Sequence, residues 1–194
     1  MEILRELLGR SESQGRVDFI GIALASRGAI QERASVRIVT GGIEDDHHCR
    51  PAGHSKRQVT LIQAEHLQVV AALLGRSSLD PTLVRRNIVV SGMNIAGLKY
   101  QTFQIGTAVL RGTGNCPPCS RMEENLGVGG YAAMLNHGGI TAVVESEGVL
   151  TVGDTVAALG LQPGFRDASW TPPKGSHHCR WPSLCQNHRV PATQ

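Results

Sequence analysis

The sequence lacks a long apolar run, a strong net charge and a disulfide framework. No apolar stretch approaches the length of a membrane-spanning helix, so we do not expect a membrane protein. The first ten residues, M-E-I-L-R-E-L-L-G-R, carry charges among their leucines and lack the apolar centre of a signal peptide. The formal net charge is only +3, which does not predict binding to nucleic acid or to an anionic membrane. The five cysteines form no repeating pattern, and we expect a cytoplasmic protein with free thiols.

Size and composition predict one compact domain with an extension at each end. The chain has 194 residues, 41% of them hydrophobic and 18% charged, which is enough to bury one good core. Residues 1–14 repeat apolar side chains at helical spacing and predict a short N-terminal helix. Residues 15–163 would form the domain. After about Gly164 periodicity is lost, and we predict a poorly ordered tail over 164–194.

The domain reads as mainly β structure. Helices are expected over 64–74, over a short segment from Asp80-Pro81 to about 85–87, and over 131–137. Gly75 would cap the first helix at its C-terminus, and Asp80 would cap the second at its N-terminus. Strands are expected over 17–25, 35–40, 57–62, 88–91, 103–112 and 156–159, with a hairpin from 140–145 to 149–151. Strands outnumber helices and do not alternate regularly with them as βαβ units would. This pattern predicts a closed or partly closed β-barrel with a few flanking α-helices.

The segment most suited to chemistry is T-G-N-C-P-P-C-S-R-M-E-E-N-L-G, residues 113–127. Its prolines suit the first turn of a helix, because proline lacks the N–H that would remain unpaired there. Cys119 would then lie in the opening turn, where the positive end of the helix favours a thiolate. Arg121 would act in the same direction. A thiolate is both a nucleophile and a soft metal ligand.

The pair Cys116 and Cys119 admits four interpretations. A thioredoxin-like redox pair needs a βαβ setting, which we do not predict. A structural zinc site needs two more ligands, for which the candidates are His47, His48 and Cys49, or Cys179, Cys185 and His188. The two cysteines could also be incidental. The fourth interpretation is one reactive thiolate beside anion-binding groups, namely Arg57, Arg86, Asn87 and the glycine-rich run at 127–130.

A long polar loop over 41–56 carries the run E-D-D-H-H at residues 44–48. Loops of this length in a compact domain are often functional. The run could bind a hard metal ion or supply an acid–base group, or it could simply be solvated.

Taken in order, these motifs resemble the MOSC domain, named for the C-terminal part of molybdenum-cofactor sulfurases. The resemblance covers roughly residues 15–157. It depends on five segments: G-G-I-E-D-D-H-H, R-Q-V-T-L-I-Q-A-E-H-L, R-R-N-I-V-V, I-G-T-A-V-L-R-G-T-G-N-C-P-P-C-S-R-M and L-T-V-G-D-T-V. The family has a β-rich, barrel-like fold and is associated with a molybdenum pterin cofactor.

The resemblance implies a set of site residues. Cys119 corresponds to the family's key cysteine, Arg86 and Asn87 to its R-N pair near the polar end of the cofactor, and Asp46 and His47 to its acidic loop. Arg57 would hold the pterin phosphate with Arg86 and Asn87. One departure is Asp45, which stands where the family usually places a glycine.

The resemblance implies two functions and leaves a third open. The first is reduction of an N-hydroxylated small molecule at a molybdenum cofactor ligated by Cys119, with electrons from a redox partner. The second is a sulfur carrier that receives a persulfide on Cys119 from a cysteine desulfurase. The third is a non-catalytic module with structural zinc. We expect a stand-alone MOSC domain without a pyridoxal phosphate site, since none of Lys56, Lys99 and Lys174 stands in a recognisable cofactor setting.

Overall fold

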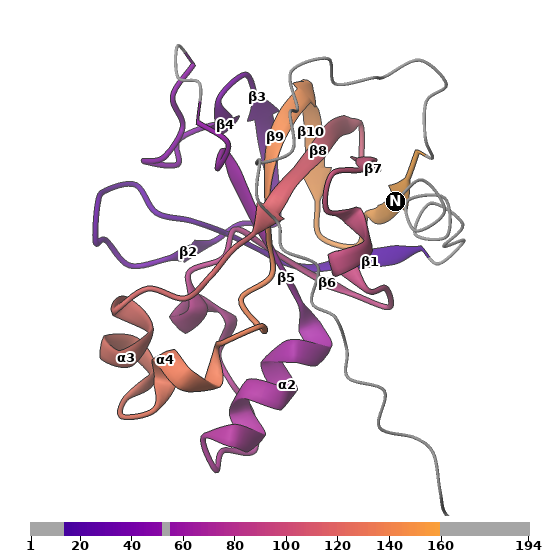
Figure 1. Ribbon diagram of the computed structural model, residues 1–194. Helices are drawn as coiled ribbons and strands as arrows, with labels where there is room; N and C mark the ends of the chain where they lie inside the picture. The colour runs from indigo at the N-terminus through magenta and orange to yellow at the C-terminus, as the bar shows by residue number, and fades with distance from the viewer. Residues whose placement is uncertain (1–13, 52–54, 160–194) are drawn as a thin grey trace, which may run out of the picture. The chain divides into compact units, whose positions relative to one another are not determined.

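Seven strands close into a barrel in the computed structural model, which describes residues 14–51 and 55–159 (Figure 1). The strands follow the order β11-β7-β8-β9-β5-β6-β1, and β1 pairs back onto β11 to close the ring. Their bounds are β1 Gly15–Ile22, β5 Val59–Gln63, β6 Ile88–Ser91, β7 Thr102–Ile105, β8 Ala108–Asn115, β9 Ile140–Ser146 and β11 Thr155–Ala158. The short β2 (Gln31–Glu32) extends β1. The prediction of a mainly β, barrel-like domain is confirmed.

A separate three-stranded sheet, β10-β3-β4, lies against the barrel. It consists of β3 (Ser35–Val39), β4 (Gly42–Ile43) and β10 (Gly148–Thr151). The predicted hairpin between 140–145 and 149–151 is wrong, because β10 pairs with β3 while β9 pairs with β5 and β8. At this crossing, the carboxylate of Glu147 accepts hydrogen bonds from the backbone N–H and the hydroxyl of Thr40, next to the pairing of β10 with β3.

The single strand predicted over 103–112 is instead the hairpin of β7 and β8. Ile105 pairs with Ala108 beside the turn, and Gly106 takes a positive φ of 55°. Phe103, Ile105, Ala108 and Leu110 are all fully buried. The apolar pattern therefore continues through the turn and hides it in the sequence.

The chain does contain one βαβ unit, contrary to prediction. Strands β5 and β6 run parallel, joined by α2 (Ala64–Leu73) and the 3-10 helix η1 (Pro81–Val84). The predicted caps are confirmed: Gly75 has a φ of 67° just after α2, and the side chain of Asp80 accepts a hydrogen bond from the N–H of Thr82. Parallel strands covered on both faces read as continuous apolar runs, and this is the pattern of β5 and β6.

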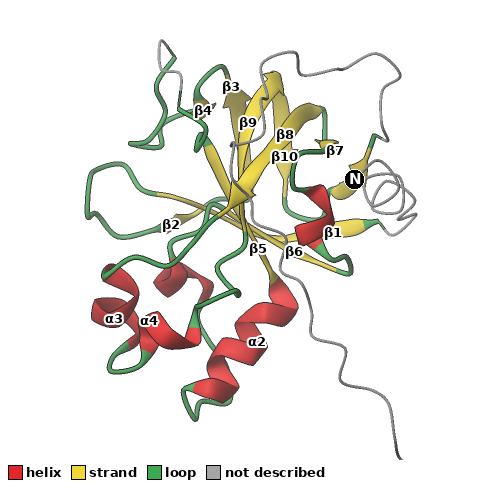
Figure 2. Cartoon of the chain, in the orientation of Figure 1, coloured by secondary structure: helices red, strands yellow, loops and turns green. Residues whose placement is uncertain are grey.

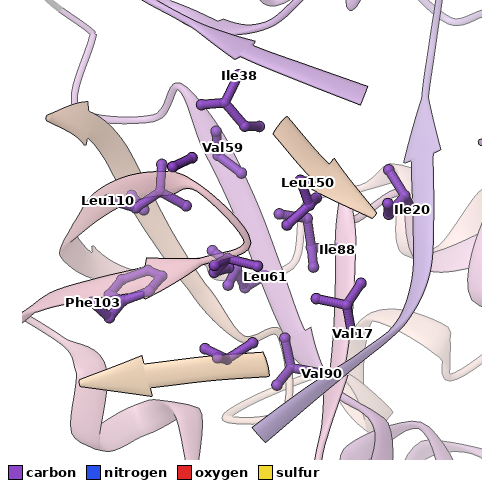
Figure 3. Close-up of a cluster of buried hydrophobic side chains, with 14 of the residues drawn as sticks. Val17, Ile20, Ile38, Val59, Leu61, Ile88, Val90, Phe103, Leu110 and Leu150 are labelled. Carbon is purple, nitrogen blue, oxygen red and sulfur yellow. The ribbon is translucent and has the colours of Figure 1, made fainter. Parts of the chain in front are cut away.

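Successive side chains of these strands face two different cores. Leu61, Ile88 and Val90 point into the barrel, where they pack with the side chains shown in Figure 3. Their neighbours Ile62 and Val89 point outward and pack against the helices. This alternation follows from the two-residue period of a strand. The outer core anchors the helices on which the site is built.

Three helices gather on one side of the barrel, away from β3, β4 and β10 (Figures 1 and 2). They are α2, α3 (Arg121–Leu126) and α4 (Gly130–Ala133), while a second 3-10 helix, η2 (Ile95–Leu98), lies between β6 and β7. Among the described residues, no helix has the length and apolar character needed to cross a membrane. The helix predicted near the N-terminus and the tail predicted over 164–194 lie outside the described residues.

Candidate functional site

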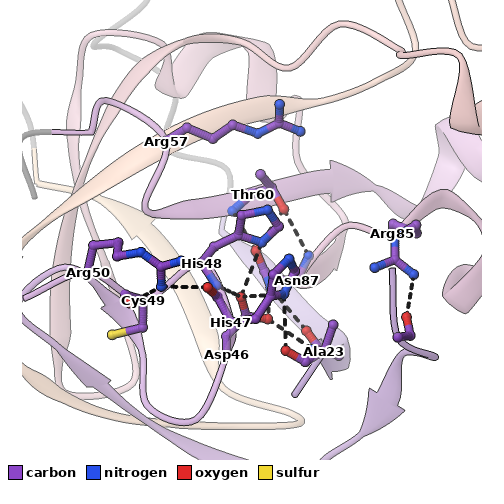
Figure 4. A network of polar contacts seen from close by, with 12 residues as sticks. Ala23, Asp46, His47, His48, Cys49, Arg50, Arg57, Thr60, Arg85 and Asn87 are labelled. Atoms are coloured by element: carbon purple, nitrogen blue, oxygen red, sulfur yellow. Dashed lines mark hydrogen bonds and ion pairs between the residues drawn. The ribbon is translucent and has the colours of Figure 1, made fainter. Parts of the chain in front are cut away.

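Asp46 is the centre of a polar network at one end of the barrel (Figure 4). The residue is only 7% exposed. Its Oδ2 accepts hydrogen bonds from the backbone N–H of Ala23 at 3.0 Å and from the side-chain amide of Asn87 at 3.3 Å. Its Oδ1 accepts one from the backbone N–H of His48 at 2.9 Å. The carboxylate is therefore fixed by donors from three separate segments.

The two histidines after Asp46 both lie against it. Nδ1 of His48 is 3.3 Å from Oδ1 of Asp46, and Nδ1 of His47 is 3.8 Å from the same atom. Burial by itself would raise the pKa of Asp46, but the hydrogen bonds from His48 and Ala23 outweigh it and lower the pKa. The carboxyl group is therefore ionised at neutral pH. His48, which the sequence reasoning left out of the site, makes the closer contact of the two.

Asp45, which stands where a glycine was expected, still adopts the backbone conformation of a glycine. Asp45 has a φ of 65°, in the left-handed region that glycine adopts most easily. Aspartate is one of the few other residues that populate this region. The position therefore keeps a glycine-like conformation without a glycine.

A small cavity of about 40 Å³ opens beside this network. Its walls include Asp46, His47, His48, Arg57, Thr60, Arg85 and Asn87. Figure 4 shows Arg57 and Arg85 on either side of the Asp46 network. Cavities that enclose whole organic ligands measure several hundred Å³, on the order of 300–1,000. This cavity is therefore smaller than an organic cofactor, and only a polar end of such a ligand would enter it.

Arg86 braces the segment that carries the two thiols. It is 3% exposed, and its guanidinium donates to the backbone carbonyls of Gly138 at 2.7 Å, Val84 at 3.0 Å and Cys116 at 3.2 Å. A fourth, longer contact reaches the carbonyl of Pro117 at 3.4 Å. Burial lowers the pKa of Arg86. The predicted cofactor ligand is thus occupied in holding the backbone around Cys116.

The side chain of Asn87 also forms its hydrogen bonds with protein atoms. Its side-chain oxygen accepts hydrogen bonds from the backbone N–H and the hydroxyl of Thr60, at 3.1 and 2.8 Å. Its amide nitrogen donates to the carbonyl of Gly21 and to Asp46. The side chain therefore joins β1, β5 and the Asp46 loop.

The two thiols have different surroundings. Cys116 is 1% exposed, and its sulfur accepts a hydrogen bond from Nη2 of Arg57 at 3.3 Å. Cys119 is exposed, and both thiols are free. The predicted helical position of Cys119 is wrong, because α3 begins at Arg121 with Ser120 as its N-cap. The residue before a proline disfavours helical geometry, so Cys116 and Pro117 do not extend α3 toward its N-terminal side.

Arg85 is a site residue that the sequence reasoning missed. It takes a left-handed conformation, with a φ of 54°, at the end of η1, and its guanidinium donates to the carbonyl of Gly28 at 2.7 Å. Its pKa is lowered first by burial and then by the positive charge of Arg121, whereas Asp46 and Cys119 act to raise it. Arg85 therefore lies within electrostatic reach of both the Asp46 network and Cys119. The only sequence signal was its place at the predicted end of a helix.

Arg121 lies two residues after Cys119. Its Nε is buried and has no hydrogen-bond partner among the described residues. The carboxylate of Glu124 lies 4.0 Å away, which is too far for a hydrogen bond. A buried donor without an acceptor indicates a place for a bound acceptor.

The loop does not complete a zinc site with the two thiols. Within residues 14–51 and 55–159, the one cluster of three metal-ligand side chains is Asp46, His47 and His48. Within the described residues, the structure therefore does not bring His47–Cys49 together with Cys116 and Cys119. The alternative ligands Cys179, Cys185 and His188 lie outside the described residues.

The part of the chain that carries the predicted site residues matches one known protein family. A family model described as the MOSC domain matches residues 44–157, more than half of the chain. The chain belongs to the MOSC domain family. This confirms the resemblance expected from the motifs, and the matched region of the MOSC domain spans the Asp46 loop and both thiols.

Solved structures share the fold of this MOSC domain. The YuaD protein from Bacillus subtilis is similar with a TM-score of 0.67 at 20% identity, covering 77% of this chain and 97% of that chain. YiiM from Geobacillus stearothermophilus gives a TM-score of 0.61 at 16% identity and covers 77% of each chain. YiiM from Escherichia coli gives 0.57 at 14%, covering 75% and 70%. No curated protein matches the sequence.

Proposed function

We propose that this MOSC domain binds a molybdenum pterin cofactor through Cys119 and reduces N-hydroxylated small molecules. The observation that carries the proposal is the surrounding of Cys119: an exposed thiol two residues before Arg121, whose Nε is buried and has no partner among the described residues. Arg85 lies within electrostatic reach, and its pKa is lowered first by burial and then by Arg121. Like charges are placed together where an anion binds between them. The unpartnered Nε of Arg121 supports the same interpretation.

The residues of the site fit such a cofactor, but their roles differ from those expected from the sequence. Cys119 offers the soft, exposed sulfur that molybdenum favours as a thiolate. Arg57, Arg85 and Arg121 would hold the phosphate, because guanidinium groups bind phosphate oxygens bidentately. Arg86 and Asn87 would support the site without touching the cofactor. Their side chains already form hydrogen bonds to backbone carbonyls and to Asp46.

The bound cofactor would supply two-electron removal of the oxygen atom, and the protein would supply positioning and protons. The balanced reaction is R–NHOH + 2 e⁻ + 2 H⁺ → R–NH₂ + H₂O, with both electrons delivered by a redox partner protein. His48 presents Nδ1 to Asp46 at 3.3 Å, so its Nε2 is free to pass a proton toward the cavity. Asp46 would hold the imidazole in that orientation.

The test is the metal content of three proteins made in a host that synthesises the cofactor. We expect the wild type to contain molybdenum and pterin and to reduce an amidoxime with a chemical electron donor. Cys119→Ser should lose both the metal and the activity. Cys49→Ser is the matched control, because Cys49 is a half-buried free thiol outside the Cys119 cluster, and it should retain both. Wild type without molybdenum, or Cys119→Ser with a full complement, would contradict the proposal.

A second candidate is favoured by the exposure of Cys119 itself, since a surface thiol can meet the cysteine of another protein. In that case Cys119 accepts sulfur from a desulfurase persulfide: Cys119–S⁻ + donor–S–SH → Cys119–S–SH + donor–S⁻. Incubation with a desulfurase and free cysteine should add the mass of one sulfur atom to the peptide that contains Cys119. A wild-type chain that gains no such mass would exclude the carrier role, and Cys119→Ser gives the background.

A further inference from the structure

Unpartnered buried polar atoms also occur outside the site, at the start of α2 and in the turn after α4. Four buried side-chain polar atoms have no hydrogen-bond partner among the described residues. One is Nε of Arg121, and the other three are Oε1 of Gln63, Nδ1 of His66 and Nδ1 of His137. Buried polar groups are almost always paired, so a concentration of unpaired ones points to an unseen ligand.

The two histidines come from different elements and face each other. His66 belongs to α2, and His137 follows α4 in the turn that leads to β9. Their ring centres are 5.0 Å apart and their planes are nearly perpendicular, at 79°. Gln63 is the N-cap of α2, one turn before His66. The backbone of Gln63 is extended, with a φ of -80° and a ψ of 131°, and its Oε1 is buried without a partner among the described residues.

This geometry matches two imidazoles on one metal ion. A tetrahedral Zn²⁺ with metal–nitrogen distances of about 2.0–2.1 Å places the centres of two ligating rings about 5 Å apart. Burial first, and then the charge that His137 can carry, lowers the pKa of His66, against the opposing effect of Glu65. The neutral imidazole, which has a free lone pair, is the form that binds metal.

We propose that His66 and His137 bind a divalent transition-metal ion, such as Zn²⁺, through their Nδ1 atoms. Oε1 of Gln63 is the candidate third donor, and water completes the coordination. This site is separate from the Cys119 site and does not depend on the proposed function. Imidazole nitrogen with a carbonyl oxygen suits Zn²⁺, Cu²⁺ or Ni²⁺ better than Mg²⁺ or Ca²⁺.

The Asp46, His47 and His48 cluster is a poorer metal site. The carboxylate of Asp46 already accepts three hydrogen bonds from nitrogen donors. Arg57 and Arg85 line the same cavity, and their positive charges oppose a cation there. The His66–His137 pair has neither obstacle, since its Nδ1 atoms are unpaired.

A metal at this position would stabilise the support of the thiol segment. The carbonyl of Gly138, the residue after His137, accepts a hydrogen bond from Arg86 at 2.7 Å. The carbonyl of Gly139 accepts one from the backbone N–H of Cys116 at 2.8 Å. The ion would therefore tie α2 to the turn that holds Cys116 in place.

The test measures Zn²⁺ binding by three full-length chains. We compare wild type, the double variant His66→Gln/His137→Gln, and the control His48→Gln, which removes a histidine of the competing cluster. All three chains share the segments outside the described residues, so any binding there cancels in the difference. Stoichiometry comes from metal analysis after dialysis, and the effect of Zn²⁺ on Tm is measured alongside.

We expect the double variant to bind one Zn²⁺ fewer per chain than wild type and to lose a Zn²⁺-dependent rise in Tm. His48→Gln should bind as much Zn²⁺ as wild type and keep the Zn²⁺-dependent rise in Tm. A folded double variant with wild-type stoichiometry would overturn the proposal, as would a loss confined to His48→Gln. If the double variant does not fold, ring-nitrogen NMR of the wild type decides, with resonances assigned from the two single variants. Zn²⁺ should shift the Nδ1 signals of His66 and His137, and unchanged signals would refute the site.

Discussion

The two polar regions at the end of the barrel differ in how completely their hydrogen bonds are made. In the first, which contains Asp46, Arg86 and Asn87, charged and amide groups are bound to protein atoms from several segments. In the second, around Cys119 and Arg121, a thiol is exposed and a buried guanidinium nitrogen has no partner. We call these the paired region and the open region.

The difference separates residues that build the site from residues that can act in it. A paired buried group contributes to stability and is costly to remove, because its partners are left unsatisfied. An unpaired group contributes no hydrogen-bond energy to the fold but keeps its bonding capacity for a ligand. Mutations in the paired region should therefore change stability strongly, and mutations in the open region should change it hardly at all.

The largest effect is expected for Arg86→Ala in the paired region. The change leaves the buried carbonyls of Val84, Cys116 and Gly138 without their donor. At about 1–3 kcal/mol for each unsatisfied group, with incomplete additivity, the free energy of unfolding should fall by about 3–5 kcal/mol. Urea denaturation measures it.

Arg111→Ala is the control for Arg86→Ala. Its Nε lies 2.6 Å from Glu145, but both side chains are more than a third exposed. Exposed ion pairs contribute about 0–1 kcal/mol. Equal losses in the two variants would show that burial and backbone pairing do not distinguish Arg86.

Asp46→Asn should cost about 2–3 kcal/mol at neutral pH, because an amide cannot accept the bonds that the carboxylate receives on both oxygens. The pKa of Asp46 is lowered in the folded protein. Its contribution to stability is therefore complete above the ordinary aspartate value of about 4 and is lost as the pH falls through the lowered pKa. Urea denaturation from neutral to strongly acidic pH should show the difference between wild type and variant shrinking below about pH 4. A difference independent of pH would contradict the ionised state.

Gly138→Ala tests the close approach that the paired region requires. A Cβ at Gly138 would press on the backbone carbonyl oxygen of Cys116, which Arg86 holds in place. Overpacking of this kind costs about 1–3 kcal/mol. At Gly97 a Cβ would meet nothing within 4 Å, and its φ is not positive, so Gly97→Ala should lose no stability. Thermal unfolding of the two variants gives the comparison.

The positions of most strands and helices follow from local sequence patterns. The wrong predictions concern which strands pair with each other. The cap at Asp80 and the strand over 88–91 were predictable, because the residues that determine them are adjacent. The separation of β9 from β10 was not, since β10 pairs with β3, more than 100 positions earlier in the chain, as the contact of Glu147 with Thr40 across 107 positions shows. The βαβ unit was missed although its strands and helices were predicted, because the parallel pairing of β5 with β6 is a contact between distant residues.

The site was predictable as a set of residues but not as a set of roles. The order of the motifs predicted Asp46, Arg86, Asn87 and Cys119 as site residues. The sequence alone does not show which of their polar groups form hydrogen bonds within the protein. Arg85 and Arg86 are both arginines in one doublet, yet Arg86 is 3% exposed and bound to backbone carbonyls, whereas Arg85 lines the cavity. Which of two adjacent guanidiniums turns inward depends on the left-handed conformation of Arg85.

The smallest effect on stability is expected for Arg121→Gln in the open region. Its Nε has no hydrogen-bond partner among the described residues, and Glu124 is 4.0 Å away. The change should therefore alter the free energy of unfolding by no more than about 0.5 kcal/mol. Binding of molybdate to the apoprotein, followed by calorimetry, should be weakened at least several-fold, because one of the two guanidiniums beside Cys119 is removed. Arg111→Gln, at an exposed position with the same chemistry, should leave molybdate binding unchanged. A loss of stability as large as that of Asp46→Asn would show that Arg121 belongs to the paired region and that the open region does not exist.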